Sequence, residues 1–201
     1  MSTFNPTPKS GRTGTRMLKR ALLLAALVLP AVLWAQVNYT RSTFTGTYTP
    51  ITEAGGGTAL TFNSLDDCTT AIPLPFDFDY NGTVFTNTTN FFQVCTNGWG
   101  AFATTATSVS TSATNTSLFT TTTPNNTVAP WWDDTDLSAE GVNPQGSVLH
   151  QTTGTAGSRV FTVQWTVSSY FTGSGATQPK LLNMQVKLYE ATGVIEFWYG
   201  Q

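Results

Sequence analysis

The chain has 201 residues, a formal net charge of −2, 10% charged residues and 12% aromatic residues. Most of its basic residues lie before residue 21, so residues 36–201 carry four basic against eleven acidic residues, a net charge of −7. This balance excludes binding along a nucleic-acid phosphate backbone. The threonine and aromatic content excludes a helical enzyme or a disordered chain and favours β-strands.

The first 35 residues have the order of a secretory signal peptide. A basic segment is followed by the apolar run 21–34 and by the small residue Ala35, which suits cleavage. Fourteen apolar residues span about 21 Å as a helix, less than the ~30 Å bilayer core, which favours cleavage over a permanent membrane anchor. Met17 is an alternative start. We predict a signal peptide over residues 1–35, a secreted or cell-surface protein, and no membrane insertion after cleavage.

From about residue 37 onward the sequence has no helical periodicity, and in its clearest segments the apolar residues alternate with a period of two, as in β-strands. In the clearest case, 160–167, Phe161 and Trp165 lie on one face and Gln164 lies on the other. A turn with Gly193 joins the last two strands into a hairpin. The predicted strands are 39–49, 59–62, 72–80, 84–86, 91–95, 99–103, 128–132, 147–151, 160–167, 182–188 and 194–199.

Short strands separated by frequent turns predict an all-β fold, a two-sheet antiparallel β-sandwich of jelly-roll type. Each sheet is expected to have one face in water. The stretch 104–127 is rich in Ser, Thr and Asn, and we expect a long polar connection there. We expect residues 36–201 to form a single β-sandwich domain and the chain to be a fragment of a longer multidomain protein.

The run 129–136 is the most distinctive segment for a binding site. Asp133, Asp134 and Asp136 place three carboxylates within four residues, and Ca²⁺ prefers such oxygen ligands. Zinc is disfavoured because the chain has one His and two Cys. The alternative is that these carboxylates are solvated turn and capping residues without a metal.

Tryptophans raise the option of carbohydrate binding, because an exposed aromatic ring can stack on a pyranose. The candidates are Trp99, Trp131 and Trp132, and the alternative is that the rings belong to the core. Trp131 and Trp132 point to opposite faces of an extended chain, so one is expected inside and the other at the surface.

Cys68 and Cys95 are the only cysteines of the chain. An even, low count in an exported protein predicts one disulfide between them, and two free thiols are the alternative. Strand parity places the Cys95 side chain on the face opposite Phe92 and Val94, away from the core.

We predict no catalytic residues. The lone histidine, His150, lies within a predicted strand, and motifs for a serine nucleophile, a zinc protease or a phosphate loop are missing from the sequence. Glu190 and Glu196 flank one hairpin and could form a glycosidase pair, but rim residues beside a turn are the favoured interpretation.

Taken in order, several segments resemble a known module. They are FDFDYNG at 76–82, VCTNGW at 94–99, APWWDD at 129–134, RVFTVQW at 159–165, NMQVKLYE at 183–190 and VIEFWYG at 194–200. The set resembles the β-sandwich module near the N-terminus of large secreted proteins of Gram-negative bacteria, which commonly precedes fibronectin type III or Ig-like repeats and a type IX secretion sorting domain. It is more distantly similar to the nidogen-type extracellular domain.

The resemblance covers about residues 39–200 and implies a β-sandwich with no known catalytic set. Such modules more often carry Ser at position 95, so the resemblance gives the disulfide no support. The expected function is a non-catalytic module for adhesion or surface display, with a Ca²⁺-assisted carbohydrate-binding module as the alternative. The expected partner is an extracellular protein or a glycan, which the sequence does not identify further.

Overall fold

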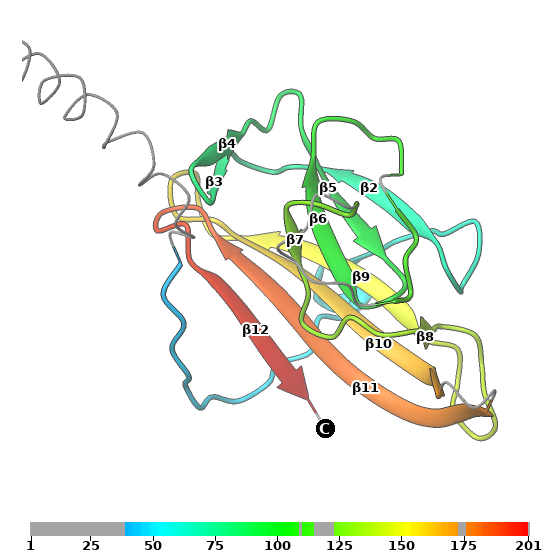
Figure 1. The fold of residues 1–201 in the computed structure, drawn as a ribbon. Helices are drawn as coiled ribbons and strands as arrows, with labels where there is room; N and C mark the ends of the chain where they lie inside the picture. Colours follow the sequence, from blue (N-terminus) through cyan, green and yellow to red (C-terminus); the bar gives the residue numbers. More distant parts are fainter. Residues whose placement is uncertain (1–38, 109, 115–122, 173–175, 201) are drawn as a thin grey trace, which may run out of the picture. The chain divides into compact units, whose positions relative to one another are not determined.

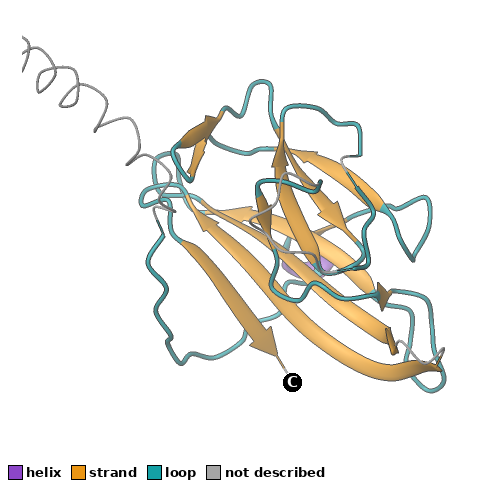
Figure 2. Cartoon of the chain, viewed as in Figure 1, coloured by secondary structure: helices purple, strands orange, loops and turns teal. Residues whose placement is uncertain are grey.

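The computed structural model describes residues 39–108, 110–114, 123–172 and 176–200. The predicted signal peptide and the centre of the predicted polar connection lie outside these residues. The chain divides into two units, residues 1–41 and 42–201, and every sheet belongs to the second. The described residues are almost entirely strands and loops, with one short 3-10 turn, η2 (Glu53–Gly55) (Figure 2). The predicted all-β fold of antiparallel sheets is confirmed.

The larger sheet runs in the order β1-β9-β10-β11-β12, and β8 also pairs with β10 (Figure 1). Every pairing in it is antiparallel. Its centre is formed by the long strands β10 and β11, which extend well beyond the predicted ranges. The strands are β1 (Thr58–Ala59), β8 (Thr135–Asp136), β9 (Ser147–Thr153), β10 (Val160–Thr172), β11 (Ala176–Tyr189) and β12 (Ile195–Gly200).

A second sheet of four strands has the order β2-β5-β6-β7, and a separate two-stranded sheet pairs β3 with β4. β5 and β6 have the predicted bounds, because a tight Asn-Gly turn at 97–98 joins two strands that are buried along most of their length. The strands are β2 (Thr69–Pro73), β3 (Phe78–Tyr80), β4 (Thr83–Phe85), β5 (Phe91–Cys95), β6 (Trp99–Ala103) and β7 (Thr127–Val128).

One apolar core joins the larger sheet to the smaller ones, as expected for a sandwich. The indole of Trp165 crosses it and donates a hydrogen bond to the Cys95 carbonyl at 2.8 Å. The predicted core positions of β10 are confirmed by their burial. The core side chains are Ile72, Leu74, Phe76, Phe78, Phe85, Phe92, Val94, Phe102, Val128, Leu137, Val148, Phe161, Val163, Trp165, Val167, Met184, Val186 and Leu188.

Three predicted strands are shorter or broken in the structure. The range 59–62 retains only its first residue, in β1. The range 72–80 is divided into the end of β2 and the whole of β3, with Pro75 between them. Proline has no backbone N–H, so a strand pairs poorly through it. The range 128–132 retains only its first residue as a strand, and Trp131 and Trp132 lie in the loop that follows.

The predicted first strand, 39–49, is wrong. Residues 44–51, here called the N-terminal strap, lie on the outer face of the larger sheet without strand structure. The strap covers Gln164 of β10 and Gln185 of β11, whose side chains are only 3% and 1% exposed. The outer face of this sheet is therefore partly buried, contrary to the predicted wet face.

Candidate functional site

Two of the three candidate tryptophans are buried. The Trp99 and Trp132 ring centroids lie 5.7 Å apart, and both indole N–H groups donate to the Ser112 carbonyl, at 3.1 and 3.0 Å. Together with Cys95 and Ala101 they form a small second core on the outer side of β5 and β6. Neither ring is exposed to stack on a ligand, so the structure removes Trp99 and Trp132 from the candidate glycan site.

Trp131, in contrast, is 41% exposed. We use the name aromatic ledge for Trp131 together with two exposed aromatic residues of β12, Phe197 and Tyr199. Phe197 and Tyr199 are 39% and 57% exposed. The Tyr199 hydroxyl donates to the Pro130 carbonyl at 2.7 Å, which fixes β12 beside the loop that carries Trp131. The two β12 rings are not among the site residues predicted from the sequence.

The position of β12 explains why these rings are exposed. Phe197 and Tyr199 stand opposite Val186 and Met184 in the β11–β12 ladder, so they share the core-facing side of the sheet. β12 is the edge strand of the larger sheet, where the core contacts end. Apolar side chains that face the core within the sheet therefore reach solvent at its edge.

The structure also assembles carboxylates, but in a different set from the predicted one. Oxygen atoms of Asp66, Asp67 and Asp134, here called the acidic cluster, lie within 4.8 Å of one another. Asp133 and Asp136 instead accept backbone hydrogen bonds, Asp133 from the Asp134 N–H at 2.9 Å and Asp136 from the Ser138 N–H at 2.7 Å. Asp134 is thus the one predicted ligand in the cluster.

Two loops that are distant in sequence are held together at the acidic cluster. The Leu137 N–H donates to the Leu65 carbonyl at 3.0 Å. Asn97 is fully buried between the loops, donating from Nδ2 to Asp67 at 2.8 Å and accepting from the Thr135 N–H at 3.1 Å. The Asn-Gly turn at 97–98 therefore also positions the acidic loops.

Burial and neighbouring negative charges disfavour the ionised forms of Asp66 and Asp134. Partial burial, followed by the charges of Asp67, Asp136 and Asp134, raises the pKa of Asp66. Partial burial and neighbouring aspartates raise the pKa of Asp134 in the same way. No ion pair joins the cluster to a basic side chain within the described residues. The arrangement suits a hard cation with oxygen ligands, such as Ca²⁺.

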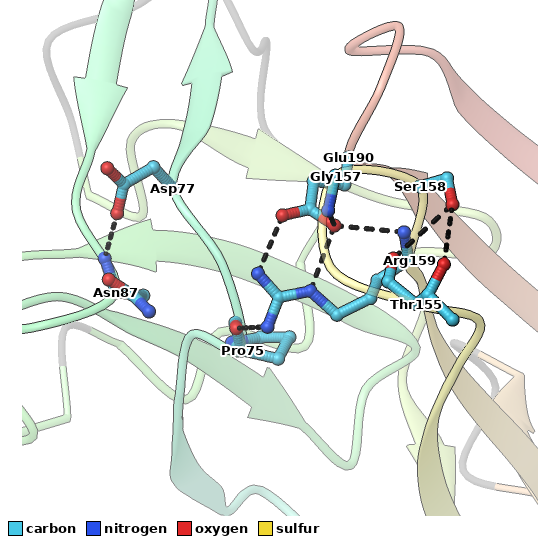
Figure 3. Close-up of polar contacts among 8 residues, drawn as sticks. All are labelled: Pro75, Asp77, Asn87, Thr155, Gly157, Ser158, Arg159 and Glu190. Atoms are coloured by element: carbon cyan, nitrogen blue, oxygen red, sulfur yellow. Dashed lines mark hydrogen bonds and ion pairs between the residues drawn. The ribbon is translucent and has the colours of Figure 1, made fainter.

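Glu190 is committed to an ion pair rather than to an open cleft. Figure 3 shows the Arg159 guanidinium between the Glu190 carboxylate and the Pro75 carbonyl. The two side chains meet twice, at 2.6 Å from NH2 to Oε1 and at 2.9 Å from Nε to Oε2. The Gly157 and Arg159 N–H groups also donate to Oε2, each at 2.9 Å. Arg159 is the main reason that the pKa of Glu190 falls to about 2.

Glu196 and His150 are also held in local contacts. Glu196 Oε2 accepts from the Tyr189 hydroxyl at 2.6 Å and from the Trp198 indole at 2.8 Å. His150 packs edge-on against Phe161, with ring centroids 6.0 Å apart, and burial lowers its pKa. A glycosidase needs one carboxylic acid with a raised pKa, and Glu190 has the opposite shift. These contacts are structural.

The predicted disulfide is not formed, since Cys68 and Cys95 are both free. The β2–β5 register places Cys95 opposite Thr69, and the Thr96 N–H donates to the Cys68 carbonyl at 2.9 Å. Successive residues of a strand point to opposite faces, so this register turns the two sulfurs away from each other. Cys95 is buried beside Trp99 on the predicted face, and burial raises its pKa to about 12.

A family model described as NIDO related matches residues 38–201. No curated protein and no solved structure matches the chain significantly. Within the described residues, none of the helical structure is long and apolar enough to cross a membrane.

Proposed function

Because the chain belongs to the NIDO-related family of nidogen-like domains, we propose that it is a non-catalytic adhesion module at the cell surface or in the extracellular space. The family match indicates an extracellular module, and the adhesive role is the proposal. The observation that carries it is the aromatic ledge. Exposed clustered aromatic rings are uncommon on a protein without partners and are typical of binding surfaces.

The chemistry of the candidate acids supports a non-catalytic role. Glu190 has its carboxylate satisfied by Arg159 and two backbone N–H groups, and Glu196 by Tyr189 and Trp198. A carboxylate held in this way is poorly placed to donate or accept a proton from a substrate. Adhesion requires only exposed complementary surface, which the ledge provides.

Carbohydrate binding is the second candidate function, and the position of Trp131 favours it. Trp131 is exposed and lies three residues before Asp134 of the acidic cluster. A ring for stacking and one of the Ca²⁺ ligands, Asp134, would then be carried by one loop. In this proposal Ca²⁺, held by Asp66, Asp67 and Asp134, fixes the loop that presents Trp131.

Export belongs to the same proposal. The signal peptide over residues 1–35 would direct secretion, with cleavage after Ala35. The resemblance to secreted bacterial modules adds type IX secretion, which a sorting domain in the continuing open reading frame would support. Sequencing of the exported protein should give Gln36 as the first residue, and a start before Ala21 would contradict the cleaved signal peptide.

The binding proposal is tested by probing arrays of glycans and of extracellular proteins with the exported chain. Trp131→Ala should weaken saturable binding, and Val142→Ala is the matched control because Val142 is 96% exposed outside the ledge. Binding to protein spots supports adhesion to a protein partner, and binding to glycan spots supports the second candidate. Binding that Trp131→Ala leaves at full strength would contradict both.

A further inference from the structure

The N-terminal strap is bound through its main chain by two glutamine side chains. The Ile51 N–H donates to Gln164 Oε1 at 2.7 Å, and Gln164 Nε2 donates back to the Ile51 carbonyl at 3.2 Å. Gln185 Nε2 donates to the Thr49 carbonyl and to Gln164 Oε1, both at 2.8 Å. The outer face of β10 and β11 thus binds the backbone of an extended segment.

The strap also fits the face closely through its side chains. Phe44 packs edge-on against Trp198 of β12, with ring centroids 4.9 Å apart. A Cβ at Gly46 would come within 2.6 Å of the Trp198 ring, and a Cβ at Gly200 within 2.7 Å of the Tyr48 ring. Few sequences can approach the Trp198 ring and Gly200 this closely, so the face is specific for a segment like the strap itself.

A glycine-rich turn, residues 52–57, connects the strap to β1. Gly56 has a φ of +90°, which non-glycine residues rarely adopt, and a Cβ at Gly57 would lie 2.4 Å from Ile51 Cγ2. The return of the chain onto its own sheet therefore depends on these glycines. An extended turn would direct the strap away from its own sheet.

We propose that the strap is exchangeable between two copies of this chain, so that each strap occupies the outer face of the other copy. Both forms make the same strap contacts, and they differ only in the conformation of residues 52–57. A turn that can open is the usual route to such exchanged dimers. A second copy is the partner because it carries the same Gly46, Tyr48 and Ile51.

Gly56→Val tests the exchange, because valine disfavours the positive φ of the closed turn. Light scattering after size exclusion should show the mass of the variant doubling relative to the parent chain. Gly193→Val is the matched control, since Gly193 also has a positive φ, +66°, but lies in the β11–β12 turn with nothing within 4 Å of an added Cβ. This control should keep the parent mass.

A second substitution separates exchange from aggregation. Gln164→Ala added to Gly56→Val should return the protein to the parent mass, because it removes both hydrogen bonds to Ile51. If Gly56→Val fails to fold, as judged by near-ultraviolet circular dichroism, Gly57→Ala replaces it as the milder variant. A folded hinge variant with unchanged mass, or a dimer that persists with Gln164→Ala, would overturn the proposal.

Discussion

Arg159 and Glu190 form a two-point ion pair where β10 begins and β11 ends, and the same guanidinium binds the Pro75 carbonyl at 2.7 Å between β2 and β3. The Arg159 guanidinium also lies over the Phe76 ring, 5.3 Å from its centroid. One side chain thereby connects the central hairpin of the larger sheet to the segment between the smaller sheets. The pair belongs to the architecture of the sandwich.

Glu190→Gln should lower the melting temperature at neutral pH and flatten its acid dependence. The pKa of Glu190 is about 2 in the folded protein and 4.5 in a free side chain. Its contribution to stability is therefore complete above about pH 4.5 and is lost as the pH falls toward 2. Melting curves between pH 2 and 7 check this, with Glu53→Gln, an exposed glutamate, as the control. If the melting temperatures of Glu190→Gln and the parent chain depended on pH in the same way, this prediction would be contradicted.

Phe102→Ala should destabilise the fold by about 3–5 kcal/mol, the range for deleting a buried Phe side chain. Phe102 is 2% exposed and contacts four other rings, Phe78, Tyr80, Phe85 and Phe92, at centroid distances of 4.8–5.2 Å. Urea unfolding measures the loss in the free energy of unfolding.

Phe197→Ala is the control for this core substitution, because Phe197 is 39% exposed and its deletion should cost less than about 1 kcal/mol. Equal losses of unfolding free energy in the two variants would show that Phe102 is not at the centre of the core.

Sequence periodicity could predict the central strands because burial in this protein follows it closely. Phe161 and Trp165 alternate with Gln164 as a sandwich strand requires, and both aromatic residues are at most 1% exposed. The strap could not be predicted. Its sequence has strand-like composition, but it binds glutamine side chains across a sheet face, a tertiary contact that leaves no local pattern.

The candidate site was predicted only in part for a similar reason. Asp134 and Trp131 come from one conspicuous run. The structure places Asp134 in the acidic cluster and leaves the Trp131 ring exposed. Their partners Asp66 and Tyr199 come from segments far away in sequence, which pairing of loops and strands brings close. The sequence run therefore indicated Asp133 and Trp132, which are neighbours along the chain, and not Asp66 and Tyr199, which are neighbours in the fold.

Both cysteines should be recovered as thiols. Cys68 is partly exposed and should react with iodoacetamide in the native protein, whereas Cys95 should react only after unfolding. Burial raises the pKa of Cys95 to about 12, so it holds almost no thiolate at neutral pH. Mass spectrometry before and after denaturation counts the modified thiols. An intact mass that is two hydrogens lower, together with alkylation that occurs only after a reductant is added, would contradict the free thiols.

Millimolar Ca²⁺ should raise the melting temperature, and chelator should reverse the rise, because a ligand that binds only the folded state stabilises it. Asp66→Asn should abolish the response. Asp133→Asn should keep it, since Asp133 lies outside the acidic cluster. Without Ca²⁺, Asp66→Asn should itself raise the melting temperature, because it removes repulsion of order 1 kcal/mol per charge pair.

Two outcomes would contradict the calcium proposal. Melting curves that are identical with Ca²⁺ and with chelator would leave the carboxylates as solvated loop residues. A response that Asp133→Asn abolishes and Asp66→Asn preserves would place the ion at the contiguous run predicted from the sequence, not at the cluster assembled by the fold.

The central claim is that the aromatic ledge is a single binding surface, and a double-mutant cycle on it is the most direct test. Calorimetric titration with a ligand recovered from the arrays should give weaker binding for Trp131→Ala and for Tyr199→Ala. If both rings contact one ligand, the losses of the two variants should not add in the double variant. Full affinity in both single variants, or strictly additive losses, would contradict a shared surface.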